Sequence, residues 1–200
     1  MARILTRLTA APAALILMTQ LASAHTGVGD ASGLMHGFMH PVGGLDHVLA
    51  MVAVGLFAAQ RGGRALWLVP LSFVAMMAVG GALGVYGVGL PLVELGIAAS
   101  VIVLGAAVAM QAKIPVAAAM GLVGFFAIFH GHAHGAEMPV DASGLAYAAG
   151  FMIATALLHA FGVGLGLAVG RLAEGHWAKA VRVAGGAMAV AGAGLLTGLI

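Results

Sequence analysis

Long apolar segments alternate with short polar, glycine- or proline-containing breaks along most of the chain. Six of these segments approach the roughly 20 residues that a helix needs to cross the hydrocarbon core of a bilayer. The predicted helices run from about Leu34 to Ala59, Leu66 to Tyr86, Leu92 to Met110, Ile114 to Phe129, Ala142 to Gly170 and Trp177 to Leu199. The pattern therefore predicts an all-α, polytopic membrane protein with six transmembrane helices.

The first 24 residues form a pattern typical of a secretory signal peptide. A basic start is followed by an apolar stretch from Ala10 to Met18 and by the small residues Ala22-Ser23-Ala24, which fit a cleavage site. We expect residues 1–24 to be removed and residues 25–200 to form the six-helix domain. The alternative is an uncleaved first helix, although the apolar stretch is short for a membrane span.

The basic residues predict how the helices are oriented. If the mature N-terminus lies outside, the connections alternate between the inner and the outer side of the membrane. All basic residues after position 24 then fall on the inner side, as the positive-inside rule requires. These residues are Arg61, Arg64, Lys113, Arg171, Lys179 and Arg182. An odd number of helices would place part of this set on the outer side.

The composition excludes several classes of protein. The chain is 62% hydrophobic and 7% charged, whereas about a quarter of the residues in a soluble protein are charged. Removal of residues 1–24 takes away Arg3 and Arg7 and leaves six basic and six acidic residues, so we expect no nucleic-acid partner. Cysteine is absent, which excludes thiolate chemistry, and signatures of zinc proteases, serine hydrolases and phosphate-binding loops are missing. We therefore expect neither an enzyme nor an organic cofactor.

A first group of candidate metal ligands lies at the start of the first predicted helix. His36, His40 and His47 are spaced by four and seven residues, which places them on one face of a regular helix. Asp46 adds a carboxylate beside His47, and such a pair is costly in hydrocarbon unless it has a function. Pro41 and the following glycines make a regular helix doubtful, and a broken helix could line a cavity. The alternative is a kinked packing helix.

A second group follows the fourth predicted helix, where the segment 129–137 reads Phe-His-Gly-His-Ala-His-Gly-Ala-Glu. If this segment is helical, His130, His134 and Glu137 share a face and His132 points elsewhere. The alternative is an exposed histidine-rich loop. His159 stands alone in an apolar helix and is either a ligand or a core histidine. Imidazole and carboxylate groups together suit a borderline transition metal.

The two motifs resemble those of the HupE/UreJ family of bacterial membrane proteins. The resemblance rests on His-Pro-Val-Gly-Gly-Leu-Asp-His at 40–47 and on the histidine-rich segment 129–137, and it extends over essentially the whole chain. It implies a secondary transporter for nickel, or sometimes cobalt, that serves hydrogenase or urease maturation. It also implies roles for His40, Asp46, His47, His130 and Glu137 and a place in a bacterial membrane. With signal-peptide cleavage, we expect this to be the cytoplasmic membrane with a periplasmic mature N-terminus.

The expected function is therefore uptake of divalent nickel, with cobalt as the alternative ion. The full set of candidate metal ligands is His36, His40, Asp46, His47, His130, His132, His134, Glu137 and His159. Three other functions remain open at this point: a metal-binding accessory or sensor protein, an intramembrane metal-dependent enzyme and a proton channel. The sequence does not indicate an oligomeric state.

Overall fold

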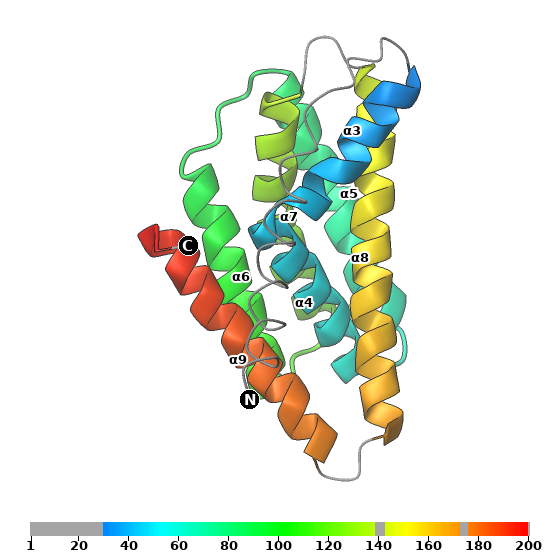
Figure 1. The fold of residues 1–200 in the computed structure, drawn as a ribbon, viewed down its shortest axis with the longest axis vertical. Helices are drawn as coiled ribbons and strands as arrows, with labels where there is room; N and C mark the ends of the chain where they lie inside the picture. Colours follow the sequence, from blue (N-terminus) through cyan, green and yellow to red (C-terminus); the bar gives the residue numbers. More distant parts are fainter. Residues whose placement is uncertain (1–29, 139–142, 173–175, 200) are drawn as a thin grey trace, which may run out of the picture.

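The computed structural model describes residues 30–138, 143–172 and 176–199, and all of the regular elements in this part of the chain are α-helices (Figure 1). They are α3 (Asp30–Gly43), α4 (Leu45–Arg61), α5 (Ala65–Val85), α6 (Val93–Met110), α7 (Val116–Ala136), α8 (Gly144–Leu172) and α9 (His176–Thr197). The predicted all-α class is confirmed. The predicted signal peptide, residues 1–24, lies outside the described residues.

Five of these helices, α5 to α9, are each long and apolar enough to cross a membrane. Helices α3 and α4 pass the same test only together, as a pair that meets at an angle of 81° and forms either a broken span or a re-entrant loop. The chain is thus a multi-pass membrane protein whose described residues hold five helices that can each span a membrane, and a sixth span if α3 and α4 form one together. Its exposed side chains agree with this, because Trp67, Leu71 and Phe161 are large apolar groups on the outside of the bundle.

The segment from Leu34 to Ala59, in which Pro41 and the glycines made a regular helix doubtful, is broken at Gly44. Gly44 is extended, with φ −96° and ψ 120°, while Pro41 is accommodated within α3. Helix α4 begins after this break, and its first hydrogen bond runs from the Val48 amide to the Gly44 carbonyl at 3.0 Å. Asp46 Oδ1 accepts the His47 amide at 2.8 Å, which satisfies one of the free donors of the first turn.

The histidine-rich segment is also placed differently from the prediction. It was expected to follow a helix that ends near Phe129, but α7 continues to Ala136. The extension packs closely on α5, because a Cβ atom on Gly131 or Gly135 would overlap the carbonyl oxygens of Met77 and Gly81. Close packing through small residues is common between transmembrane helices, and here it continues the helix beyond its apolar stretch.

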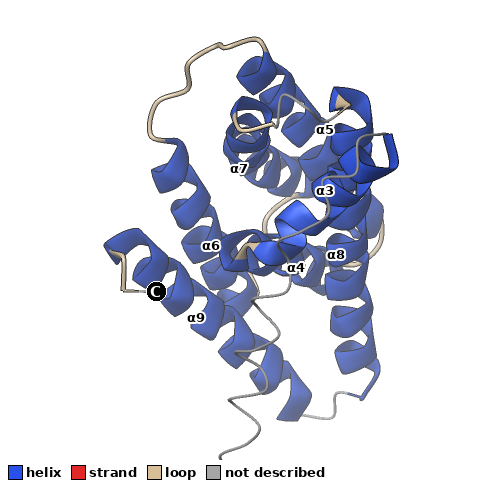
Figure 2. Ribbon diagram, turned by 45° about the horizontal axis from the view of Figure 1, so that its top comes forward, coloured by secondary structure: helices blue, strands red, loops and turns tan. Residues whose placement is uncertain are grey.

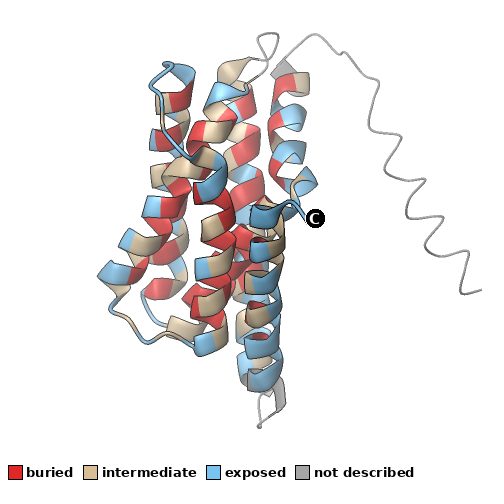
Figure 3. Cartoon of the chain, turned by 90° about the vertical axis from the view of Figure 1, so that its left-hand side faces the viewer, coloured by how far each residue is buried: buried red, intermediate tan, exposed pale blue. Residues whose placement is uncertain are grey.

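The helices pack in pairs that bring the two motifs together. Helices α3 and α4 lie along successive parts of α8, α5 lies against α7, and α6 lies against α9 (Figure 1). A tilted view shows α3 crossing above α4 (Figure 2). Buried residues face the centre of the bundle, and exposed ones face outward (Figure 3). The region around the α3–α4 break is therefore enclosed by α7 and α8.

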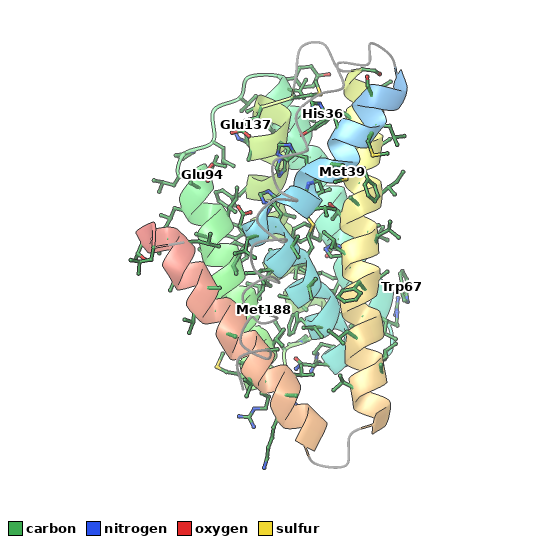
Figure 4. All side chains as sticks on the ribbon, viewed as in Figure 1. His36, Met39, Trp67, Glu94, Glu137 and Met188 are labelled. Carbon is green, nitrogen blue, oxygen red and sulfur yellow. The ribbon has the colours of Figure 1, made fainter. Side chains whose placement is uncertain are left out.

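The two ends of the bundle differ in their polar residues. The connections after α4, α6 and α8 lie at one end, the lower end in Figure 1. Arg61, Arg64, Lys113, Lys179 and Arg182 belong to these connections or to adjoining helix turns. We call this the basic end. His36, Glu94 and Glu137 lie toward the opposite end (Figure 4), which we call the histidine end.

Candidate metal-binding site

Four imidazole rings from three helices gather beside the α3–α4 break. His134 is central, with its ring centroid 4.6 Å from that of His40 and 4.4 Å from that of His47. The His130 ring lies 5.0 Å from the His47 ring at an interplanar angle of 90°. His47, His130 and His134 are buried, whereas His40 is exposed. We call His40, His47, His130 and His134 the histidine cluster.

A short chain of polar contacts runs through the cluster. Asp46 Oδ1 lies 2.6 Å from His47 Nδ1, and His47 Nε2 lies 2.5 Å from His134 Nε2. A carboxylate only accepts, so His47 Nδ1 carries the hydrogen of the first contact. When His47 is neutral, its Nε2 atom therefore carries a lone pair, and His134 Nε2 donates its hydrogen to that atom. His134 Nδ1 then carries a second lone pair. This atom is buried and has no hydrogen-bond partner among the described residues.

His130 is oriented by a serine that the sequence analysis did not select. Ser100 Oγ on α6 lies 2.6 Å from the Ile97 carbonyl oxygen and 2.8 Å from His130 Nε2. Two oxygen atoms this close need a hydrogen between them, so the hydroxyl donates to Ile97 and accepts from His130 Nε2. His130 Nδ1 is therefore a lone pair, and it too is buried without a partner in the described structure. The only signal in the sequence was a lone hydroxyl within an apolar helix.

Three predicted ligands are not part of the cluster of rings. His132 points elsewhere, as predicted for a helical segment, and its Nε2 donates to the Val88 carbonyl at 2.7 Å. His36 and Glu137 are exposed toward the histidine end (Figure 4). Glu137 directly follows α7, and its amide donates to Ala133 at 3.1 Å. The structure thus brings together His40, His47, His130 and His134. It leaves His132, although it is buried, bonded to a partner outside the cluster.

His159 is buried in the core on α8, with 1% of its surface exposed. Neither of its ring nitrogens has a hydrogen-bond partner among the described residues. Its ring centroid lies 5.0 Å from that of Phe73, which in turn lies 5.7 Å from that of His130. Phe73 on α5 is therefore in contact with both a cluster histidine and this isolated imidazole.

The cluster is not arranged as a closed metal site. In the described parts of the chain, no group of three or more histidine and acidic side chains is positioned to hold an ion. Two nitrogens that share an ion at zinc-like bond lengths of about 2.0–2.1 Å are roughly 3.4 Å apart in tetrahedral geometry. The His47 and His134 Nε2 atoms are closer, at 2.5 Å, and the hydrogen of His134 lies between them, so this contact must open before His47 Nε2 can bind an ion.

A cavity of about 420 Å³ leads to the cluster from between α5, α7 and α8. His134 lines it together with Tyr147 and Phe151, and most of the other lining residues are apolar or glycine. The cavity gives His134 space on one side of the ring. The His134 ring therefore borders free space into which it can turn when the His47–His134 contact opens.

Comparison with known proteins identifies the relatives of this chain. Protein HupE from Rhizobium leguminosarum bv. viciae is 48% identical over 186 residues, which cover 92% of this chain and 95% of that protein. No solved structure matches the chain significantly. The family described as HupE / UreJ protein matches residues 13–195. The chain, with its two histidine motifs joined inside a helical membrane bundle, belongs to the HupE/UreJ family.

Proposed function

We propose that the protein is a secondary transporter that takes up divalent nickel across the bacterial cytoplasmic membrane. Cobalt is the alternative ion, and hydrogenase or urease maturation is the expected use of the metal. The observation that carries the proposal is the gathering of His40, His47, His130 and His134 from both motifs inside a multi-pass bundle. Buried imidazoles in a membrane protein are costly without a function, and neutral imidazole suits nickel and cobalt.

The path we propose begins at the histidine end, which we place on the periplasmic side together with the mature N-terminus. His36, His132 and Glu137 form the outer part of the path, and Glu137 and His36 are exposed there. The histidine cluster and Asp46 form the main binding site. There the lone pairs on His130 Nδ1 and His134 Nδ1, and His47 Nε2 once its contact opens, replace water around the ion.

Asp46 has two effects in this proposal. It holds the hydrogen on His47 Nδ1 through the 2.6 Å contact and so leaves Nε2 as the donor to the metal. Its negative charge also offsets part of the charge of a divalent ion. A membrane potential that is negative inside contributes about 2.3 kcal/mol per charge per 100 mV, or about 4.6 kcal/mol for a divalent ion. This energy can drive uptake without ATP.

The proposal is tested by uptake of radioactive nickel into liposomes that contain the purified protein. We expect steady, potential-driven uptake by the wild type and its loss in Asp46→Asn and His47→Ala. His176→Ala is the matched control, because His176 begins α9 at the basic end, and it should transport normally. Equal uptake by the wild type, Asp46→Asn and His47→Ala, at equal protein levels, would overturn the proposal.

The same experiment separates the main alternatives. A metal-binding accessory or sensor protein would bind nickel at the cluster without transport, so binding in detergent with no flux in liposomes would favour it. A metal-dependent enzyme would require a substrate and an open coordination position, and steady ion flux by the protein alone would argue against it.

A further inference from the structure

A second cavity, of about 370 Å³, lies at the basic end and is separate from the histidine cluster. The end of α4, the α6–α7 connection, the last turns of α8 and the start of α9 enclose it. Its polar lining residues are Gln60, Arg61, Gln111 and Lys113. Two of these are cationic, and none of its described lining residues is acidic. The cavity is thus electropositive.

Arg61 carries an unused hydrogen-bond donor at this cavity. Its Nε atom is buried and has no hydrogen-bond partner among the described residues. Arg182, by contrast, donates from Nε to the Ala109 carbonyl at 3.1 Å. An unpaired buried donor costs free energy, and more so on a charged group. The arrangement around Arg61 is therefore completed by an acceptor that the described chain does not supply.

Gln60 adds an unused acceptor beside this donor. Its Nε2 donates to the Val108 carbonyl at 2.9 Å, which fixes the direction of the amide group. Its Oε1 atom is buried and lacks a partner within the described structure. A suitable ligand would therefore present anionic oxygens to the basic groups and a hydroxyl or amine hydrogen to Gln60.

The acidic residues whose side chains the structure describes do not account for the basic groups. Asp46 contacts His47 beside the histidine cluster, and Glu94 and Glu137 lie toward the histidine end (Figure 4). Glu174 of the α8–α9 connection lies outside the described residues. The apolar part of the lining, Val169 and Val181 with Gly166 and Gly170, provides a surface along which a hydrocarbon chain could lie.

We infer that this cavity binds a phosphate ester that carries a hydroxyl group, as found in the headgroup of phosphatidylglycerol or in free glycerol phosphate. Arginine binds phosphate through two parallel hydrogen bonds, and lysine adds a point charge. Gln60 Oε1 accepts the hydroxyl hydrogen. Basic pockets between transmembrane helices are known to bind anionic headgroups. The inference does not depend on which ion the histidine cluster handles.

The test compares lipid binding by two charge-matched double variants. Arg61→Gln with Lys113→Gln removes the two cations of the cavity. Arg64→Gln with Lys179→Gln removes two exposed basic residues of the same end that do not line it. Native mass spectrometry of the purified protein in neutral detergent then measures binding of phosphatidylglycerol, of phosphatidylcholine with the same acyl chains, and of glycerol phosphate.

We expect the wild type to bind phosphatidylglycerol about tenfold more tightly than phosphatidylcholine, a preference that the cavity variant loses and the control keeps. Competition by glycerol phosphate would identify a soluble ester as a ligand, and its failure would identify the lipid. Arg61→Lys keeps the charge and tests the site if the double variant does not fold; it should bind with intermediate affinity. Equal loss in both double variants, or no preference for the anionic lipid, would overturn the inference.

Discussion

Ser100 holds His130 in one tautomer from a neighbouring helix. Its Oγ atom lies 2.8 Å from His130 Nε2, and its own hydrogen is directed to the Ile97 carbonyl oxygen at 2.6 Å. The imidazole therefore keeps its hydrogen on Nε2 and its lone pair on Nδ1. Partners of this kind orient histidine ligands in metal sites and raise their basicity. In this protein the partner comes from α6, which contributes no histidine.

Ser100→Ala should leave the tautomer of His130 unfixed and weaken nickel binding by about tenfold or more. Ser100→Thr should restore binding, because its hydroxyl can make both contacts. The measurement is the apparent KM of nickel uptake together with the ¹⁵N spectrum of labelled histidine. The spectrum should show a single Nε2–H form for His130 in the wild type and in Ser100→Thr.

The spectrum tests the hydrogen bond even if the protein does not transport nickel. A wild-type His130 with its hydrogen on Nδ1 would contradict the assigned direction of the Ser100 contact. An unchanged KM in Ser100→Ala, with a mixed tautomer in the spectrum, would show that the contact has no part in uptake.

Gly131 sets the distance between α5 and α7 and thereby the position of the cluster. A Cβ atom at Gly131 would overlap the Met77 carbonyl oxygen, whereas one at Gly121, earlier on the same helix, would meet no heavy atom within 4 Å. We expect Gly131→Ala to destabilise the protein by about 1–3 kcal/mol through overpacking. Gly121→Ala should be neutral or slightly stabilising.

Thermal unfolding in detergent, followed by circular dichroism, measures both glycine variants. Nickel uptake should fall in Gly131→Ala because His130 and His134 lie on either side of the displaced contact. Equal midpoints for the two variants would show that the helices can separate at no cost, contrary to the packing described above.

Much of the helical arrangement could be predicted from apolar segment lengths. The irregularity of the first span was also expected, since Pro41, Gly43 and Gly44 are poor residues for a continuous helix. The 81° angle at Gly44 was not predictable, because it depends on how α3 and α4 pack on α8. The extension of α7 was missed for a related reason: the histidines after Phe129 end the apolar pattern, but Gly131 and Gly135 let the helix continue against α5.

For the candidate site, the sequence likewise predicted relationships within one helix but not those between helices. Spacing along one helix correctly placed His130 and His134 on one face and His132 on another. It also grouped Glu137 with the first two, but α7 ends before Glu137. Spacing could not show that His134 lies between His40 and His47, because those residues are on different helices from His134. Ser100 could not be predicted either, since its importance comes only from the packing of α6 beside α7.

The proposed orientation predicts which residues are accessible from outside the cell. The chain has no cysteine, so single cysteines can be labelled without background. Gly89→Cys, between α5 and α6 at the histidine end, should react with a maleimide that cannot cross membranes. Ala117→Cys, exposed in the first turn of α7 at the basic end, should react only after the cells are permeabilised. The reverse result would place the histidine end in the cytoplasm and contradict uptake through this path.

His159 should show opposite effects on stability and on transport. Its ring is buried, and neither nitrogen has a hydrogen-bond partner in the described part of the chain, which costs free energy in the folded state. His159→Leu removes these unpaired groups at similar volume and should raise stability by about 1 kcal/mol. If His159 receives the ion after it passes Phe73, the same variant should transport more slowly at saturating nickel.

Thermal unfolding and the maximum uptake rate measure the two effects on one protein. A nickel affinity close to that of the wild type is expected, since His159 makes no contact with the His40–His134–His47 rings of the cluster. Slower uptake together with higher stability would assign His159 to the transport path. A variant that only loses packing would show a lower stability as well as slower uptake. A stabilised variant with normal uptake would instead make His159 a core residue, and the path would have to leave the cluster by another route.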